Sequence, residues 1–486
     1  MKKRFEGDFM LEYITEEKAG LKQGSSRKFI TSLVKKRVNL HSVMLLRHGK
    51  VFFEEYAPNF PREFKHRLYS VSKTYVSAAV GVAIGEGYFS LDTKICEFFK
   101  DKLPENPHPY IKALTVRDCL VMATPFNETP YKNTHTDWVY DFFNAVPTHR
   151  GGSIFNYDTG ASLVLDELVN RATGKPFNEY LYEKVLKHIG YSECPECVEA
   201  PDGTKWGGSG MLCTTEEFAE FAKLFMNNGK SDGGKQLIPE QYIKEATSKQ
   251  IGNIEDNAQN SLRGYGYGYQ VWLLKNGFAM FGMGNQLALF FPKEDVIFIC
   301  TGDDQGNDFA RTYIIDYLEE IILKQLNPEN EKESLSLCMP VQFGKAYSDV
   351  QNKISGKIYK LENNPMGMKT VSFDFSEETR KMIFTTGDGE KEILFGSGEY
   401  KEFSFPQKNY SGKRINTPLG RGYRSFCCGT WDMENLLVLK CYAADMYFGV
   451  FTLNVRFNEN AVDLHFTKRA EWFFDEYNGF ATGTAD

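Results

Sequence analysis

The chain has 486 residues, a formal net charge of −7 and 42% hydrophobic residues, which is ordinary for a soluble globular protein. This length exceeds what one compact core usually organises, so two domains are expected. No run or stripe of Lys and Arg stands out and no stretch of about 18 apolar residues occurs, so we expect neither nucleic acid nor a membrane as a partner.

The amino-terminal segment begins MKKR, but acidic residues follow it and the apolar core of a secretory signal does not. The ten cysteines are scattered and lack the spacing of a small disulfide-rich domain. We therefore expect a cytoplasmic protein. Cys194 and Cys197 form a lone CxxC, and because no second CxxC or histidine pair accompanies it, we expect two free thiols in a surface loop and no metal site.

Two apolar runs flank Arg47-His48-Gly49-Lys50 within residues 42–56, which predicts two strands joined by a turn. The next segment, residues 71–86, carries apolar side chains on nearly every side, and the run Gly85-Glu86-Gly87 is a plausible stop. We therefore expect a hairpin followed by a buried helix.

Helical spacing dominates residues 90–250. Its clearest segment is residues 214–229, where Thr214 or Thr215 can cap a helix and Glu217 supports the cap. The phenylalanines of this segment form an apolar stripe that favours core packing over a binding surface: Phe218, Phe221 and Phe225.

From residue 264 the period changes to that of strands. Three runs, 264–274, 277–291 and 295–304, predict three antiparallel strands, and residues 308–326 predict a closing helix. Strands at both ends of a long helical insertion indicate an α+β fold, in which helices flank one antiparallel sheet and form a lobe beside it.

The polar segment 327–336 is typical of a linker. Beyond it, short alternating runs separated by turn residues predict an all-β barrel or sandwich of about 150 residues. We therefore expect two domains, 1–330 and 337–486.

Ser-x-x-Lys occurs three times, but only the copy at Ser70 and Lys73 lies in an apolar helix; those starting at Ser25 and Ser32 lie in polar or solvated segments. Residues i and i+3 share a helix face, so the Lys73 amine can reach the Ser70 hydroxyl. Burial lowers a lysine pKa, which lets such a lysine take a proton near neutral pH. The alternative is a lysine that extends to solvent from the first turn, and this stretch alone leaves both interpretations open.

Two further segments favour a reactive site. Tyr157 precedes a predicted helix after a glycine-rich approach, where a tyrosine could relay a proton or simply lie in the core. Gly282 and Gly284 flank Met283, and glycines allow a substrate to approach backbone N–H groups as an oxyanion hole requires, although a bulge or tight bend needs them too.

With these segments in order, the chain resembles the serine β-lactamase superfamily, in the branch of class C β-lactamases, esterases and 6-aminohexanoate-dimer hydrolases. The resemblance covers about residues 40–325. It is carried by these stretches: LLRHGKVFFEEY, YSVSKTYVSAAVGVAIGEGYFSLD, FNYDTGASLVLDELVNRATGKPFNEYLYEKV, GGSGMLCTTEEFAEFAKLFMNNG, GYGYGYQVW and FGMGNQLALFFPKEDV.

The resemblance implies that Ser70 is the nucleophile, Lys73 its general base and Tyr157 a second proton relay. It implies that the N–H groups of Ser70 and Met283 form the oxyanion hole. It also places Thr159, Gly282 and Gly284 at the substrate, and it implies that no metal or organic cofactor is needed.

Three departures from the family pattern bear on the substrate. Met280-Phe281-Gly282 stands where β-lactamases and peptidases have Lys/His-Thr-Gly, so the cation that helps hold a substrate carboxylate is missing, unless an arginine such as Arg150 or Arg263 supplies it. Tyr157-Asp158-Thr159 replaces Tyr-Ser-Asn, and residues 122–125 replace His-Thr-Ser-Gly.

We therefore expect a serine hydrolase that cleaves a small ester or amide through a Ser70 acyl-enzyme. The alternatives are a β-lactamase or D-peptidase similar to penicillin-binding proteins, and a catalytically idle binding protein of the same fold whose β domain mediates interaction. A Ser-His-Asp hydrolase is a weaker alternative, because no G-x-S-x-G elbow is present.

Overall fold

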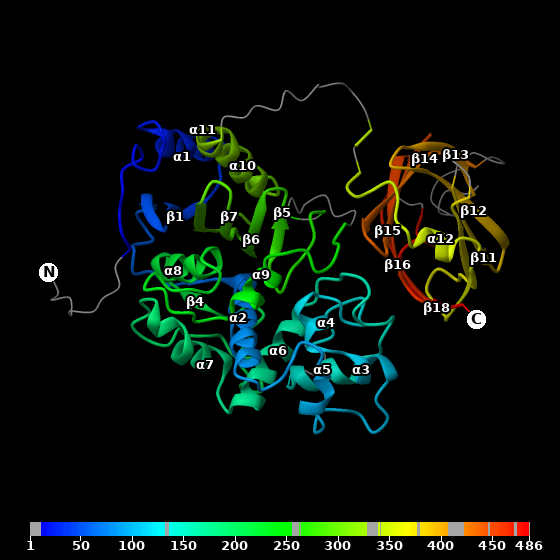
Figure 1. Ribbon diagram of the computed structural model, residues 1–486, viewed down its shortest axis with the longest axis horizontal. Helices are drawn as coiled ribbons and strands as arrows, with labels where there is room; N and C mark the ends of the chain where they lie inside the picture. Colours follow the sequence, from blue (N-terminus) through cyan, green and yellow to red (C-terminus); the bar gives the residue numbers. More distant parts are fainter. Residues whose placement is uncertain are drawn as a thin grey trace.

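The computed structural model describes residues 11–131, 136–254, 262, 264–327, 339–340, 342–376, 380–406, 422–445, 448–470 and 474–485. Two large hydrophobic cores occur in these ranges. The first spans residues from Leu11 to Leu323, and the second spans residues from Ile354 to Ala481. Figure 1 shows the two parts side by side, with the N-terminus and the C-terminus at opposite ends.

The first part is built on an antiparallel sheet with the strand order β2-β1-β8-β7-β6-β5 among the described residues. These strands are β1 (Leu40–Arg47), β2 (Lys50–Tyr56), β5 (Trp272–Leu274), β6 (Gly277–Gly282), β7 (Gln286–Phe291) and β8 (Val296–Gly302). The hairpin predicted for residues 42–56 is confirmed as β1 and β2. Strands from the two ends of this part meet where β1 pairs with β8.

The expectation of three strands between residues 264 and 304 is wrong, because the structure has four. The run 277–291 is a hairpin, and the chain reverses between β6 and β7 at Met283-Gly284-Asn285. Gly284 and Asn285 both have positive φ angles, 78° and 64°, which suit glycine and asparagine and allow the tight reversal. The first run contributes only its last three residues, as β5.

Helices cover both faces of this sheet, as Figure 1 shows. One face carries α1 (Ser25–Lys35) and the helical segment that ends the first part. This segment consists of α10 (Ala310–Tyr317), the π-helical turn Leu318–Leu323 and α11 (Lys324–Leu326). The other face carries α2 (Ser72–Gly85) and α8 (Thr215–Met226). Twelve of the fourteen residues of α2 are buried, so the prediction of a buried helix is confirmed.

The clearest helical pattern is confirmed as α8. Thr214 caps it in a capping box with Glu217, and the predicted phenylalanine stripe is buried in the core. Phe221 stacks on Tyr75 of α2 with 3.7 Å between ring centroids and 13° between ring planes. This contact joins α8 to the helix that follows Ser70.

The helical lobe lies between β2 and β5 in the sequence. Its helices are α3 (Pro109–Ala113), α4 (Val116–Leu120), α5 (Trp138–Asn144), α6 (Thr159–Thr173), α7 (Phe177–Lys184) and α9 (Glu240–Ala246), with 3₁₀ turns at Ile95–Phe98 and Leu186–His188. Two short strands, β3 (His66–Arg67) and β4 (Leu212–Cys213), pair with each other. This pairing places the residues that precede Ser70 beside the residues that precede α8.

The second part follows a short helix, α12 (Gln351–Ile354), and the choice between barrel and sandwich is decided in favour of a barrel. Within the described ranges, the ring runs β12-β11-β10-β9-β18-β17-β16-β15-β14 and closes where β14 pairs in parallel with β12 at Cys428 and Gly429. The additional strand β13 pairs with residues 423–427 of β14. The strands are β9 (Ile358–Leu361), β10 (Thr370–Asp374), β11 (Arg380–Thr386), β12 (Gly389–Ser397), β13 (Lys401–Phe405), β14 (Tyr423–Met433), β15 (Leu436–Ala444), β16 (Phe448–Asn458), β17 (Ala461–Ala470) and β18 (Gly479–Thr484). The linker predicted at 327–336 lies outside the described residues, apart from Asn327.

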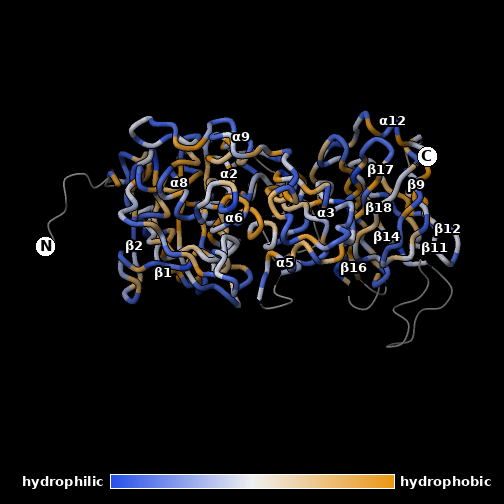
Figure 2. The backbone as a smooth tube through the Cα atoms, turned by 90° about the horizontal axis from the view of Figure 1, so that it is seen from below, coloured by the Kyte–Doolittle hydropathy of each residue, from blue (hydrophilic) through white to orange (hydrophobic). Residues whose placement is uncertain are grey.

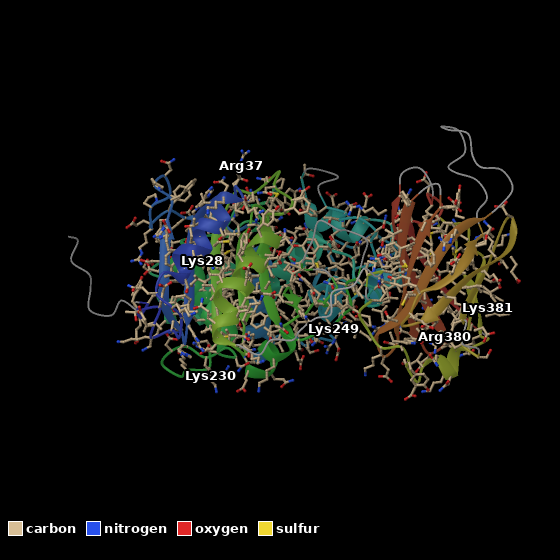
Figure 3. The ribbon with its side chains drawn as sticks, turned by 90° about the horizontal axis from the view of Figure 1, so that it is seen from above. Lys28, Arg37, Lys230, Lys249, Arg380 and Lys381 are labelled. Atoms are coloured by element: carbon tan, nitrogen blue, oxygen red, sulfur yellow. The ribbon has the colours of Figure 1, made fainter. Side chains whose placement is uncertain are left out.

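Figures 1 and 2 both place the barrel beside the helical lobe. Lys249, which Figure 3 labels between the two parts, donates to Asp432 at the end of β14. Ile254 of the first part forms a small apolar cluster with Leu436 and Val438 of β15. In the described part of the chain, no helix combines the length and the apolarity that a bilayer crossing requires.

We expect the stripe on α8 to contribute to folding. Phe221→Ala should lower the free energy of unfolding by about 3–5 kcal/mol, because it leaves a cavity against Tyr75. Val34→Ala is the matched control, since this valine of α1 is 65% exposed and should change stability by less than about 0.5 kcal/mol. Urea denaturation followed by tryptophan fluorescence measures both; equal effects would contradict the assignment of the stripe to the core.

Candidate functional site

Ser70 lies in a 3₁₀ turn, Tyr69–Val71, immediately before α2. Tyr69 has a φ of 48°, a left-handed conformation that is costly for a bulky residue and that surrounding contacts must hold. One such contact is the Leu68 amide, which donates to the Met211 carbonyl at 2.8 Å. The serine is therefore held on a strained turn at the start of a buried helix.

The Lys73 side chain is 1% exposed, so it does not extend to solvent. Its Nζ lies 3.1 Å from Ser70 Oγ and donates to the Gly208 carbonyl at 2.5 Å. Burial lowers the Lys73 pKa to about 7, although the nearby Asp158 carboxylate opposes this by favouring the charged form. A large fraction of these amines is therefore neutral near physiological pH and able to accept a proton.

The other two Ser-x-x-Lys copies do not form such a pair. Ser25 Oγ donates to the Lys22 carbonyl, and Ser32 Oγ donates to the Lys28 carbonyl at 3.0 Å. Lys28 is exposed, and Figure 3 shows it on the surface of the first part. Among the three copies, only Ser70 and Lys73 are brought together.

A glycine-rich segment, residues 207–211, supplies the second acceptor for Lys73. The Gly207 amide donates to Asp166 Oδ2 at 2.7 Å, and the Met211 amide donates to Ser72 Oγ at 3.0 Å, which fixes the segment at both ends. A Cβ on Gly208 would lie 2.6 Å from the Thr159 methyl group, so a glycine is required for this close approach. Gly208 is not among the site residues predicted from the sequence.

Tyr157 ends the tyrosine loop, which we define as residues 148–157 between α5 and α6. Its ring centroid lies 5.3 Å from Lys73 Nζ, and the ring also stacks near Trp272, at 5.5 Å between centroids and 24° between planes. Thr159 begins α6 and contacts the Gly208 position. The structure therefore brings Tyr157 and Thr159 to the same place as Ser70 and Lys73.

Asp158, which departs from the family pattern, is fully buried and caps α6. Its Oδ1 accepts from the Gly160 amide and its Oδ2 accepts from the Thr124 hydroxyl, each at 2.7 Å. Burial raises the Asp158 pKa, whereas these hydrogen bonds and the charge of Lys73 act in the opposite direction. An aspartate directly before a helical run is a capping signal, and this role was not included in the sequence-based site.

The end of β6 packs against the turn that carries Ser70. A Cβ built on Gly282 would lie 2.2 Å from the Leu68 carbonyl oxygen and 3.2 Å from the Ser70 amide nitrogen. Met283 follows with a side chain that is 46% exposed. Gly284 lies instead against Gly302 at the end of β8, so of the two predicted glycines only Gly282 contacts the Ser70 turn.

No residue of β6 carries a cation, and Met280 is fully buried. The Arg311 guanidinium of α10 lies over the Phe281 ring at 3.7 Å. Successive side chains of a strand point to opposite faces, so Phe281 and Arg311 lie on the face opposite to the one where Gly282 meets Ser70.

Of the two arginines considered from the sequence, the structure places only Arg150, and it faces the barrel. Arg150 donates to the Gly483 carbonyl of the barrel at 3.1 Å, and Arg263 lies outside the described residues. Arg67 is closer in the chain to Ser70. Its guanidinium lies against the rings of Tyr69 and Trp206, at 4.7 Å and 4.8 Å, and two of its N–H groups donate to Ser209.

Cys194 and Cys197 are both free thiols and half-buried, so the expectation of free thiols is confirmed. Asn178 donates to Cys194 Sγ at 3.6 Å, and burial raises the pKa of the Cys197 thiol far above its usual range. The described residues contain no group of three or more His, Cys, Asp or Glu side chains that could hold a metal ion.

Comparison with known proteins is consistent with this geometry. A protein of Alkalihalophilus pseudofirmus, itself uncharacterized, is 21% identical over 305 residues, which cover 57% of this chain and 87% of the relative. A Bacillus anthracis structure with the provisional name 6-aminohexanoate-dimer hydrolase has a TM-score of 0.50 and 18% identity, and covers 61% of this chain and 81% of its own. A Bacteroides dorei structure with the provisional name β-lactamase has a TM-score of 0.52 and 16% identity, and covers 63% of this chain and 99% of its own.

At these identities the two solved structures show a shared fold. The family model described as Beta-lactamase matches residues 27–319, which is more than half of the chain and contains Ser70, Lys73 and Tyr157. Fold and sequence pattern therefore agree, and the chain belongs to the β-lactamase family, within the serine β-lactamase-like superfamily of hydrolases.

Proposed function

We propose that the protein is a serine hydrolase that cleaves a small ester or amide through a covalent acyl-enzyme on Ser70. The observation that carries this proposal is the buried Lys73 amine at 3.1 Å from Ser70 Oγ. A hydroxyl is a weak nucleophile on its own, and an adjacent amine with a lowered pKa is a recurrent way to activate it.

In the proposed reaction, neutral Lys73 takes the Ser70 proton while Ser70 Oγ attacks the carbonyl carbon of the substrate. The N–H groups of Ser70 and Met283 stabilise the oxyanion, for which the contact of Gly282 with the Ser70 turn is favourable. Tyr157 relays the proton to the leaving group, which departs as an alcohol or amine. Water then attacks the acyl-enzyme and releases the acid.

The absence of a cation on β6 supports a neutral substrate over a β-lactam or a peptide C-terminus. A carboxylate beside buried Met280 would lose hydration without a charged partner, whereas a neutral acyl group would bury apolar surface at about 25 cal/mol per Å². Among the similar structures, one is named for a 6-aminohexanoate-dimer hydrolase and one for a β-lactamase, and neither name decides the charge of this protein's substrate. An idle binding protein is disfavoured by the close Ser70–Lys73 pair and the adjacent Tyr157.

The first prediction concerns the nucleophile. A fluorophosphonate probe should attach once to the wild-type chain, at Ser70, and should not label Ser70→Ala. Ser32→Ala is the matched control, because Ser32 begins another Ser-x-x-Lys copy but donates only to a helix carbonyl, so this variant should label normally. Mass spectrometry of the labelled peptides gives the answer, and a label that persists in Ser70→Ala would exclude Ser70 as the nucleophile.

The second prediction concerns the base. Because the neutral amine is the active form, kcat/KM should be low at pH 5 and rise to a plateau through a pKa of about 7. Lys73→Arg should lower kcat by about 10²–10⁴-fold, since a guanidinium keeps its proton at these pH values. The control is Lys28→Arg, because Lys28, labelled in Figure 3, is exposed; this variant should leave the dependence of kcat/KM on pH unchanged. Turnover by Lys73→Arg at the wild-type rate would remove the lysine from this role.

The third prediction concerns the substrate. Under one set of conditions, kcat/KM for short-chain p-nitrophenyl esters should exceed kcat/KM for a chromogenic cephalosporin, because charge-assisted contacts to the cephalosporin carboxylate are missing on β6. Met280→Lys restores the family cation and should improve the cephalosporin relative to the ester. If the wild-type enzyme prefers the cephalosporin, its carboxylate must find another cation, and Arg67 is the first to substitute.

A further inference from the structure

The barrel contacts the hydrolase part at the tyrosine loop itself. Phe480 of β18 stacks between two imidazoles, that of His149 in the loop at 3.6 Å and that of His465 in β17 at 3.8 Å, with 3° between ring planes in each pair. All three side chains are buried. Burial lowers the His149 pKa to about 3, so this ring is neutral and suited to stacking on an apolar face.

Polar contacts lie beside this stack. Arg150 donates to the Gly483 carbonyl at the end of β18. Its charge also lowers the pKa of the buried Asp463 carboxyl of β17, against the larger effect of burial, which raises it. Nearby, the Tyr110 hydroxyl donates to Glu362 of the barrel at 2.7 Å. The loop therefore meets β17 and β18 through both an aromatic stack and charged groups.

The same loop is bound on its other side to the segment that replaces His-Thr-Ser-Gly. Three backbone amides donate to carbonyls of that segment: Thr148 to Pro125 at 2.9 Å, Gly152 to Ala123 at 2.7 Å and Asn156 to Met122 at 2.8 Å. The loop is thus held between residues 122–125 and the barrel, and Tyr157 follows directly after the last of these bonds.

We propose that the C-terminal barrel holds the tyrosine loop in its working position, with Phe480 as a positioning residue that acts through Tyr157. The proposal rests on the proposed function, since the proton relay by Tyr157 belongs to it. It assigns the barrel a part in catalysis. Without the stack, residues 148–156 lose one of the surfaces that hold them, which also include residues 122–125 and, at Phe155, the rings of Tyr267 and Trp272. The tyrosine hydroxyl then moves relative to Lys73 and the leaving group. A misplacement of about 1 Å is enough to slow a reaction strongly.

The test uses the dependence on the leaving group in the full chain. A p-nitrophenolate departs without a proton, whereas the alkoxide of the matching ethyl ester needs one from the relay. Phe480→Ala should therefore lower kcat for the ethyl ester on the order of 10- to 100-fold and leave kcat for the p-nitrophenyl ester much less affected. Tyr157→Phe should show the same selectivity, and adding Phe480→Ala to it should cause little further loss.

Lys249→Met is the matched control, because Lys249 joins the two parts at Asp432 and not at the tyrosine loop. It should leave the ratio of the two esters at the wild-type value. Arg150→Gln removes a weaker loop contact and should shift the ratio in the direction of Phe480→Ala, which keeps the test available if the alanine variant folds poorly. Two outcomes would overturn the proposal. One is an equal loss of kcat on both esters in Phe480→Ala, and the other is that Phe480→Ala lowers kcat as much in the Tyr157→Phe variant as it does in the wild type.

Hydrogen exchange separates this inference from the proposed function, because it needs no substrate. The amides of Thr148, Gly152 and Asn156 should exchange faster in Phe480→Ala than in the wild type and Lys249→Met. Unchanged protection in the alanine variant overturns the positioning role even if the enzyme is active. Absence of both hydrolysis and Ser70 labelling in the wild-type chain would instead overturn the proposed function.

Discussion

The arrangement of the site depends on one buried lysine, Lys73, whose side-chain nitrogen has a serine hydroxyl and one backbone carbonyl as its hydrogen-bond partners. Desolvation of Lys73 would be costly for a permanent charge, so the site favours the neutral amine. Asp158 is close enough to oppose this shift, but its two oxygens accept from Gly160 and Thr124. The capping role of the aspartate thus keeps a carboxylate near the lysine without forming an ion pair that would hold its proton.

The surroundings of Lys73 depend in turn on residues of other segments. The Gly208 carbonyl reaches Lys73 only because the segment 207–211 approaches closely enough to exclude any side chain at that glycine. Asp166 of α6 and Ser72 of α2 hold that segment at its two ends. Twelve of the fourteen residues of α2 are buried, and the desolvation of Lys73 within this helix is what favours its neutral form.

The sequence predicts those features that depend on residues close together in the chain. Ser70 and Lys73 are one helical turn apart, and the strands of the barrel alternate, so both could be predicted from short windows. The Gly208 carbonyl could not, because it is a backbone atom 135 residues from the lysine: the glycine-rich run at 207–210 marks the segment, but nothing in the sequence shows that its carbonyl reaches Lys73. The apolar period of residues 277–291 predicts one strand, because glycines occur both within strands and in tight turns, and only the structure shows the β6–β7 hairpin. Arg150 was considered for substrate binding, yet its partner lies in β18, which no local pattern connects to it.

The positions of the arginines bear on the charge of the site as a whole. Arg311 lies over Phe281 on the far face of the sheet, and Arg150 faces the barrel, so neither adds charge where β6 meets the Ser70 turn. Above pH 7 most Lys73 amines are neutral as well. Among the described arginines, Arg67 carries a fixed charge close to Ser70 in the chain, and its guanidinium lies against two rings and donates to Ser209. If the proposed mechanism holds, these positions favour stabilisation of charge that develops at the oxyanion over attraction of an anionic group in the ground state.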